Sequence, residues 1–207
     1  MTQILQIHPQ NPQPRFIDEV AAALKSDGVI IYPTDSAYAL GCKIGSKTGM
    51  EKIRQIRELD KNHNFTLICR DLSDISRYAI VSNIVFRFLK ASTPGPFTFI
   101  LEATKEVPKM LQHPKKKTIG IRIPDNQIVK SILKELGEPL MSVTLILSDH
   151  EAPIASLDEI YEKIDSRVDV VIDGGSCGHQ PTTVIDFVAG IPRVLREGKG
   201  KIDIFSI

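Results

Sequence analysis

The sequence predicts an α/β protein: a twisted mixed sheet of parallel and antiparallel strands with flanking helices. Short apolar runs rich in β-branched residues alternate with amphipathic stretches, which is the pattern of a sheet covered by helices. Several late strands are separated by connections too short for a helical crossover, so the sheet must be mixed rather than wholly parallel. No repeat, low-complexity tract or linker divides the chain, and we therefore expect residues 1–207 to form a single domain.

In the first half of the chain, apolar spacing and capping residues predict helices and strands in alternation. Phe16, Val20 and Leu24 form one helical stripe, and Gly28 follows the end of that helix. A hydroxyl or carboxylate at Ser46 or Asp71 can cap the helix that follows it. The elements expected here are a helix over 15–26, a strand over 29–32, a helix after Ser46, a strand over 65–69, a short helix after Asp71, a helix over 83–90 and a strand over 97–103.

The second half continues the same alternation. Asp125 can cap a helix that Gly137 closes, and the capping box that begins at Ser156 opens another helix, which runs to about Ile164. The strands expected here cover 118–123, 140–147, 168–172, 182–187 and 192–196.

Composition excludes several classes of protein. Twenty-six Lys and Arg against 25 Asp and Glu leave a formal charge of +1, which excludes a generally cationic nucleic-acid binder but not a local basic face. No apolar run reaches the roughly 18–20 residues of a membrane span, and residues 1–15 lack the apolar centre of a signal peptide. Three scattered cysteines without a Cys-x-x-Cys pattern indicate a cytoplasmic setting.

Several well-known sequence motifs are missing. There is no phosphate-loop motif, no dinucleotide-binding motif and no Gly-x-Ser-x-Gly motif. The five histidines have no metal-ligand spacing, so we predict no structural metal.

Five polar clusters lie at the ends of predicted strands, where open α/β sheets bind ligands. Arg122 is the sole charge in an apolar strand and needs a carboxylate or phosphate partner, although an internal ion pair would satisfy it equally well. Pro94 and Gly95 belong to a rigid turn whose backbone can approach a ligand, but most such turns are only turns. The clusters are YPTDSAYALG at 32–41, STPGPFT at 92–98, GIRIP at 120–124, PTTVID at 181–186 and RVLREG at 193–198.

A basic run precedes one predicted strand. Lys115, Lys116 and Lys117 follow His113 and Pro114. Such a run is either a solvated loop or a contact for the phosphate backbone of nucleic acid, which would be independent of sequence and weakened by salt. The spacing of residues thus indicates an α/β domain with strand ends suited to an anionic ligand.

The five clusters, in this order, resemble the motifs of the YrdC/YciO family. The run at 32–41 is similar to the family's common YPTDTVYGLG, and the four later clusters resemble its later motifs. One such motif would be weak evidence, but five in register across nearly the whole chain are specific. The variants SAYALGCK at 36–43 and HNFT at 63–66 are most similar to the YciO branch.

This resemblance implies a YrdC-like fold with a large, concave, positively charged face suited to RNA or nucleotides. It also implies relatives that make threonylcarbamoyl-adenylate from threonine, bicarbonate and ATP with Mg, for modifying adenosine beside the tRNA anticodon. By position, Thr34, Tyr38 and Thr183 correspond to the threonine-binding part of the cleft. The positions that correspond to the nucleotide-binding part are Pro94, Gly95, Arg122, Pro124, Ser142, Thr144 and Arg196. The resemblance assigns no catalytic residue.

Two motifs depart from the synthase branch, which usually has Lys-x-Arg after the second helix and Ser-x-Asn on the long central strand. Arg57 keeps one cation and Thr144 one hydroxyl at these places, but Leu59 and Ile146 remove a cation and an amide. Adenylate formation expels pyrophosphate, and losing one donor at such a site typically costs about 10²–10³ in rate. These losses need not add, and Arg54 or His63 could compensate, so we expect reduced activity rather than none. Arg57 and His63 are therefore further candidates for binding the substrate.

Three functional hypotheses follow. The first is a binder of RNA, such as double-stranded RNA or tRNA, or of nucleotides, with at most weak threonylcarbamoyl-adenylate chemistry. The second is a genuine threonylcarbamoyl-adenylate synthase acting in tRNA modification. The third is an enzyme on another small anionic substrate, with Leu59 and Ile146 forming an apolar wall. We place the first slightly ahead of the second, and an inactive cleft is a further alternative. The sequence indicates no oligomeric state.

Overall fold

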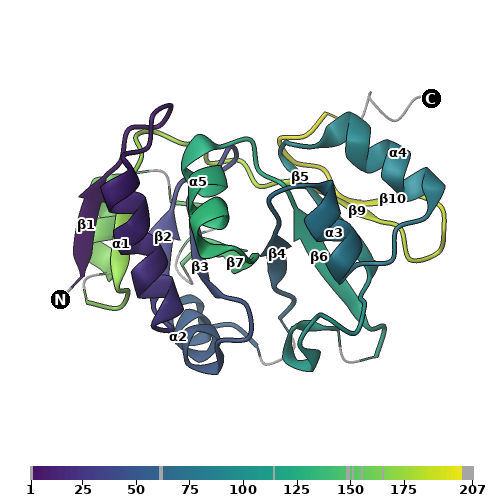
Figure 1. Ribbon diagram of the computed structural model, residues 1–207, viewed down its shortest axis with the longest axis horizontal. Helices are drawn as coiled ribbons and strands as arrows, with labels where there is room; N and C mark the ends of the chain where they lie inside the picture. The colour runs from purple at the N-terminus through teal and green to yellow at the C-terminus, as the bar shows by residue number, and fades with distance from the viewer. Residues whose placement is uncertain are drawn as a thin grey trace.

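The protein is built around one sheet of ten strands (Figure 1). The computed structural model describes residues 2–60, 63–113, 115–147, 150, 152–154, 156–164 and 166–201. The strands are β1 (Gln3–Gln6), β2 (Val29–Tyr32), β3 (Ala39–Lys43), β4 (Thr66–Ile68), β5 (Phe97–Glu102), β6 (Thr118–Arg122), β7 (Leu140–Thr144), β8 (Val170–Asp173), β9 (Thr183–Asp186) and β10 (Arg193–Arg196).

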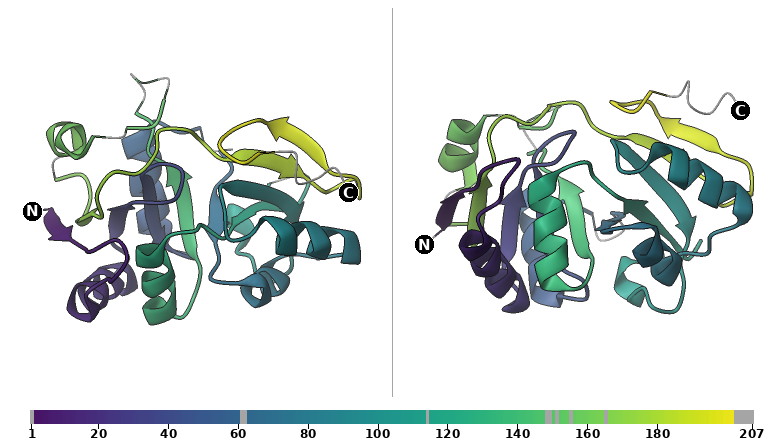
Figure 2. Two further views of the ribbon diagram at one scale, coloured as in Figure 1. Left: turned by 90° about the horizontal axis from the view of Figure 1, so that it is seen from above. Right: turned by 45° about the horizontal axis from the view of Figure 1, so that its top comes forward.

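The sheet is mixed, as the short late connections predict. Its strand order is β1-β8-β2-β3-β7-β4-β6-β5-β9-β10. Four neighbouring pairs are parallel, β1–β8, β2–β8, β4–β6 and β5–β9, and the other neighbours run antiparallel. The hairpin of β9 and β10, yellow in Figure 2, forms the edge of the sheet opposite β1.

Helices cover both faces of this sheet. They are α1 (Pro14–Lys25), α2 (Lys47–Arg57), α3 (Leu72–Tyr78), α4 (Asn83–Ser92), α5 (Gln127–Leu136) and α6 (Leu157–Ile164), with a 3₁₀ turn at Lys109–Leu111. Alternate residues of β2 enter different cores: Ile30 and Tyr32 pack with α1 and α5, whereas Val29 and Ile31 belong to the core shared with α2, α3, α4 and α6. Because side chains alternate along a strand, the two cores lie on opposite faces. In Figure 1, α1 and α5 lie side by side over one half of the sheet only.

Local signals predicted most elements within one to three residues of their ends. The caps at Ser46 and Asp71 are confirmed, since each side chain accepts a hydrogen bond from a backbone N–H of its helix. The expected cap at Asp125 is wrong: the side chain of Asn126 accepts from Val129 N–H instead, and α5 begins one residue later. The strand expected over 140–147 ends at Thr144.

Two strands, β1 and β3, were not predicted. In β1 the core signal is weak, because only Leu5 of its four residues is buried. In β3 the run ALGCK is rich in small residues, yet its first four residues are buried. Gly41 is required there, because a Cβ at that position would lie 2.8 Å from the ring of Tyr32. Within the described part of the chain, no helix has the length and apolar character that crossing a membrane requires.

Candidate anion-binding cavity

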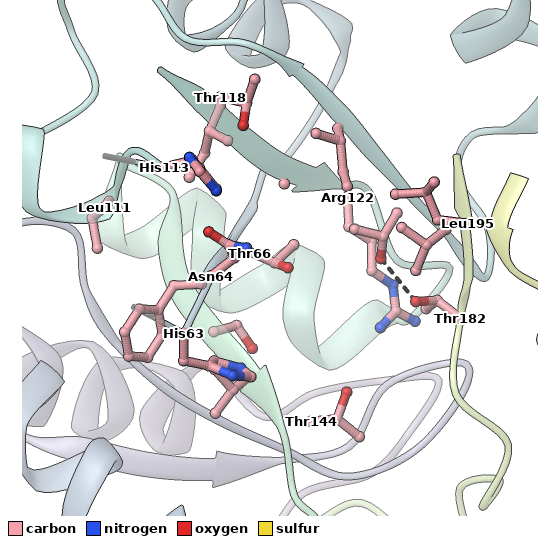
Figure 3. A pocket seen from close by; sticks show the side chains of 18 of the residues that line it. His63, Asn64, Thr66, Leu111, His113, Thr118, Arg122, Thr144, Thr182 and Leu195 are labelled. Atoms are coloured by element: carbon pink, nitrogen blue, oxygen red, sulfur yellow. Dashed lines mark hydrogen bonds between the residues drawn. The ribbon is translucent and has the colours of Figure 1, made fainter. Parts of the chain in front are cut away.

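A cavity of about 380 Å³ lies on the sheet face that α1 and α5 leave partly open. The pairing register of the strands brings together the residues that form the floor of this cavity. Thr66 of β4 lies opposite Ser142 of β7 on one side and Gly120 of β6 on the other, and Ile100 of β5 lies between Gly120 and Asp186 of β9. These residues therefore point to one face of five adjacent strands. Figure 3 shows side chains converging on this space from several strands.

Hydroxyl groups line much of the floor. Thr98 and Thr182 share a hydrogen bond of 2.8 Å between their Oγ1 atoms, which is the dashed line ending at Thr182 in Figure 3. Ser142 Oγ accepts from the Tyr32 hydroxyl at 2.6 Å and donates to a backbone carbonyl of β3 at 3.0 Å. The hydroxyl side chains on the cavity wall are Thr66, Thr98, Thr118, Ser142, Thr144 and Thr182.

The charged side chains on the wall are mainly cationic. Among the residues that the structure describes, Arg57, Lys116, Arg122 and Arg196 line the cavity, against one carboxylate, Asp186. The imidazoles of His63 and His113 also face it, from opposite parts of the rim in Figure 3. An excess of fixed cations in a concave, partly desolvated space attracts anions.

Arg122 is held in place by the loop after β2. Its guanidinium forms an ion pair with Asp35 and donates to Thr34 Oγ1 at 3.3 Å. The second oxygen of Asp35 accepts from Asp125 N–H at 3.1 Å. Arg122 is 6% exposed, and its buried Nε has no hydrogen-bond partner among the described residues. The internal partner that the sequence left open is thus present, yet one donor of the guanidinium is still unsatisfied.

Arg57 supplies a second unsatisfied donor. It ends α2, and its buried Nε also has no hydrogen-bond partner in the described part of the chain. Burial lowers the pKa of this guanidinium from its ordinary value. Desolvation, together with the nearby charges of Arg57 and Arg54, lowers the pKa of His63, so this imidazole is neutral near pH 7.

A β-bulge aims Arg196 toward the cavity. In the β9–β10 pair, Val194 lies opposite Ile185 and Arg196 opposite Val184, so Leu195 is an extra residue. The extra residue keeps Arg196 on the face of Val184, where it lines the cavity. Its guanidinium donates to the backbone oxygen of Thr182 at 3.0 and 3.1 Å.

The lysine run forms a tight turn at the rim. His113 Nδ1 accepts from the backbone N–H groups of Lys116 at 3.1 Å and Lys115 at 3.3 Å, and this leaves Nε2 as the protonated nitrogen of a neutral ring. His113 and Lys116 line the cavity, whereas the exposed Lys115 and Lys117 are not part of its wall. Pro114 lies outside the described residues.

The three positions that correspond to a threonine site lie beside the cavity rather than on its wall. Thr34, Tyr38 and Thr183 are at most 3% exposed. Thr34 Oγ1 donates to Ala37 O at 2.6 Å, the Tyr38 hydroxyl to Gly175 O at 2.8 Å, and Thr183 Oγ1 to Gly200 O at 2.7 Å. Each hydroxyl is therefore engaged by the chain's own backbone.

The other residues predicted to bind the nucleotide lie partly on the wall of the main cavity and partly elsewhere. Ser142 and Thr144 lie on the cavity wall. Pro94 and Pro124 line a second cavity of about 260 Å³ beside α3 and α5, and Gly95 donates its N–H to a backbone oxygen at 2.9 Å.

The two apolar residues that stand where the synthase branch has hydrogen-bond donors lie in different places. Ile146 lines the main cavity, whereas Leu59 packs against the apolar core and is not on the cavity wall. The apolar wall expected from both residues is therefore formed by Ile146 without Leu59.

Sequence reasoning missed several wall residues. Thr66, Thr98 and Thr118 are inconspicuous because threonine is an ordinary strand residue, and Thr182 and Asp186 stand out only as parts of a motif. Alternation was an available signal only for Thr118, which lies on the same face of β6 as the predicted Arg122, whereas Asp186 lies on the opposite face of β9 from the predicted Thr183. Register between strands, which the sequence does not show, aligns them.

The wall suits a nucleotide better than a protein-bound metal. No group of three or more His, Cys, Asp or Glu side chains converges anywhere in the described ranges. Mg²⁺ usually keeps several waters and binds through one or two carboxylates together with substrate phosphates. The residues present therefore fit a magnesium ion that arrives on the phosphates of ATP, not one held by the protein alone.

Comparison with known proteins gives consistent matches. The Sua5/YciO/YrdC family, described as telomere recombination, matches residues 22–198. The chain is 49% identical over 205 residues to the uncharacterized protein YciO of Escherichia coli K12, covering 99% of this chain and 100% of that protein. It is 27% identical to a putative threonylcarbamoyl-AMP synthase of Methanocaldococcus jannaschii, over 94% of this chain and 92% of the relative.

Solved structures share the fold. The crystal structure of E. coli YciO matches with a TM-score of 0.95, covering 99% of this chain and all of that one. P. abyssi Sua5 in complex with L-threonine matches with a TM-score of 0.87 at 20% identity, over 95% of this chain and 58% of the larger protein. The second likeness shows a common fold alone.

Proposed function

This chain belongs to the Sua5/YciO/YrdC family, and from that premise we propose that its cavity binds phosphate-bearing ligands: a nucleotide, or a nucleotide unit of an RNA chain. We further propose that it carries out at most weak ATP-dependent threonylcarbamoyl-adenylate chemistry. The setting proposed for this activity is the cytoplasm, since the three cysteines form no disulfide.

The unsatisfied guanidinium donors are the observation that carries this proposal. Burying a donor without an acceptor costs roughly 1–3 kcal/mol, and such groups are uncommon away from functional sites. Arg57 and Arg122 both have a buried Nε without an acceptor among the described residues, and both line one cavity. Phosphate oxygens would satisfy both donors, and the hydroxyls of Thr98 and Thr182 can add further hydrogen bonds.

The lysine turn extends this site to longer ligands. Lys116 lines the cavity, and the exposed Lys115 and Lys117 continue the charge outward along the rim. An RNA chain with one nucleotide unit in the cavity would carry its neighbouring phosphates past these side chains. Double-stranded RNA and tRNA are bound largely through shape and phosphates, which requires no aromatic stacking platform.

Two features support weak adenylate chemistry. Ile146 places an apolar side chain on the cavity wall, where it offers no donor to charge that develops in a transition state. The hydroxyls of Thr34, Tyr38 and Thr183 already donate to backbone oxygens, so threonine could use them as donors only after those bonds break. Threonine, bicarbonate and ATP with Mg²⁺ are thus partners whose joint reaction we expect to be slow.

Calorimetry and filter binding test the proposal. Wild-type protein should bind ATP and should retain double-stranded RNA with an affinity that falls steeply as salt rises. Arg57→Gln should weaken ATP binding about tenfold, because it removes a charged donor from the wall. Arg87→Gln, a matched change on the exposed face of α4, should leave the affinity within twofold. Absence of binding to ATP and to every RNA tested would refute the proposal.

A genuine synthase is the second candidate, and the relative in M. jannaschii named as a putative threonylcarbamoyl-AMP synthase favours it. Release of pyrophosphate from ATP that requires threonine and bicarbonate, at a rate of ordinary enzymes, would establish this alternative. The third candidate, an enzyme on another small anionic substrate, draws support from the apolar Ile146 in the wall. A metabolite that copurifies with the protein and is turned over by it would favour that one.

A further inference from the structure

The main cavity contains one carboxylate among its cations, and within the described residues that carboxylate has no cationic partner. Asp186 is half-buried at the end of β9. Its Oδ1 accepts from Val188 N–H at 2.8 Å, and it forms no ion pair with any residue that the structure describes. Arg193 lies opposite Asp186 on β10, but its exposed side chain makes no ion pair with it. Asp186 therefore presents unused acceptor capacity to a ligand.

Asp186 lies at the far end of β9 from the phosphate-binding groups. Thr182, whose hydroxyl hydrogen-bonds with Thr98 and accepts from Arg196, is four residues earlier, which corresponds to roughly 13 Å along an extended strand. Arg122 lies opposite Ile68 and near the Thr182 end, where its Nε lacks an acceptor among the described residues. The Arg122 end of the cavity thus carries no carboxylate of its own beyond Asp35, which Arg122 already pairs, whereas at the other end the negative charge of Asp186 opposes the nearby positive charge of Lys116 beside Thr118.

The floor beside Asp186 is formed by a glycine and an isoleucine. Gly120 and Ile100 occupy the row that ends at Asp186. A Cβ at position 120 would lie 3.1 Å from Thr66 Oγ1, so glycine keeps the floor low at this point. A planar or five-membered ring can lie on these two residues with its edge toward the carboxylate.

We propose that Asp186 accepts a hydrogen bond from a neutral donor of the bound nucleoside, either a ribose hydroxyl or a base amino group. This inference rests on the proposed function. The carboxylate thereby sets the direction of the ligand, with the phosphate at Arg122 and the nucleoside at Asp186. The same charge discriminates against inorganic polyphosphates, which would place negative charge at both ends of the cavity.

Two titrations test this assignment, because the same substitution should weaken the binding of one ligand and strengthen the binding of the other. AMP and inorganic triphosphate are each titrated by calorimetry into wild-type protein and Asp186→Asn, in the presence of EDTA so that no divalent cation bridges ligand and carboxylate. Asp186→Asn should bind AMP about tenfold more weakly, because a charge-assisted hydrogen bond is lost, and triphosphate several-fold more tightly, because repulsion is removed. Glu102→Gln makes the same charge change on β5 outside the cavity wall, and it should shift neither affinity more than twofold.

The wild-type protein provides a second test that needs no variant to fold. Removing the 2′-hydroxyl, as in 2′-deoxy-AMP, or the amino group, as in purine riboside monophosphate, should weaken binding at least fivefold for one of the two, which identifies the donor. Equal binding of all three nucleotides, or a shift of AMP and triphosphate in the same direction in Asp186→Asn, would overturn the role of Asp186 and leave the proposed function standing. No binding of either AMP or triphosphate to wild-type protein would instead overturn both.

Discussion

Replacing Arg122 with methionine is expected to destabilise the protein by about 3 kcal/mol. Arg122 and Asp35 form an ion pair whose side chains are only 7% and 12% exposed. Removing one partner of a buried pair typically costs about 3–5 kcal/mol, because the other charge stays buried without compensation. We expect the lower end of this range, since Asp35 would retain the hydrogen bond from Asp125 N–H.

Urea denaturation of a double-mutant cycle measures this cost. A loss of about 3 kcal/mol corresponds to a fall in Tm of about 6–12 °C for a chain of this size. The variant Arg122→Met/Asp35→Asn should recover about 2 kcal/mol of the loss, because it leaves no buried charge behind. Arg87→Met, on the exposed face of α4, should change stability by less than about 0.5 kcal/mol.

The same cycle contains the result that would refute this reasoning. A cost below about 1 kcal/mol for Arg122→Met, or costs that simply add in the double variant, would mean that Asp35 does not fix the guanidinium. The orientation of Arg122 toward the cavity would then lack its physical basis.

Three other predictions follow from the wall and the core. Ile146→Asn alone should raise the rate of pyrophosphate release from ATP with threonine and bicarbonate about tenfold or more, since it restores a donor to the wall; an unchanged rate would count against a shared site. Lys116→Gln should reduce the salt slope of duplex-RNA binding by about 0.9, and the exposed Lys109→Gln should not; equal slopes would remove the lysine turn from the interface. Desolvation raises the pKa of Tyr32 to about 12, so its contribution to stability is complete below pH 10 and is lost as pH rises through 12. Replacing Tyr32 with Phe should remove this dependence on pH, which for two pKa units amounts to about 3 kcal/mol, in denaturation measured between pH 10 and 12.

Features with a local cause could be predicted from the sequence. The strand at 29–32 is apolar and bounded by Gly28 and Pro33, and the structure has β2 over the same residues. The caps at Ser46 and Asp71 depend on a side chain and a backbone N–H three residues away, so a short window contains all the information needed. The mixed sheet also followed from short connections between late strands.

Features with a distant cause could not be predicted. β1 forms through pairing with β8, more than 160 residues later, and little in its own sequence marks it. The residues of the candidate site likewise fall into those that the sequence could indicate and those that it could not. A carboxylate or phosphate partner was expected for Arg122, internal or from a ligand, because a lone charge in an apolar strand is conspicuous. Thr66 and Thr98 have no such mark, and only the register of β4, β5 and β6 places them beside it.

The position of β9 and β10 at one edge of the sheet has a consequence for synthesis on the ribosome. These strands contribute Asp186 and Arg196 to the cavity, Thr182 directly precedes them, and Lys199 donates to the backbone oxygen of Asp35 in the loop that orients Arg122. A nascent chain can assemble β2 to β8 well before this hairpin emerges, because translation adds only about 5–20 residues each second. Until then the cavity lacks one wall, so a ligand that needs contacts from this hairpin can bind only after synthesis of the chain is nearly finished.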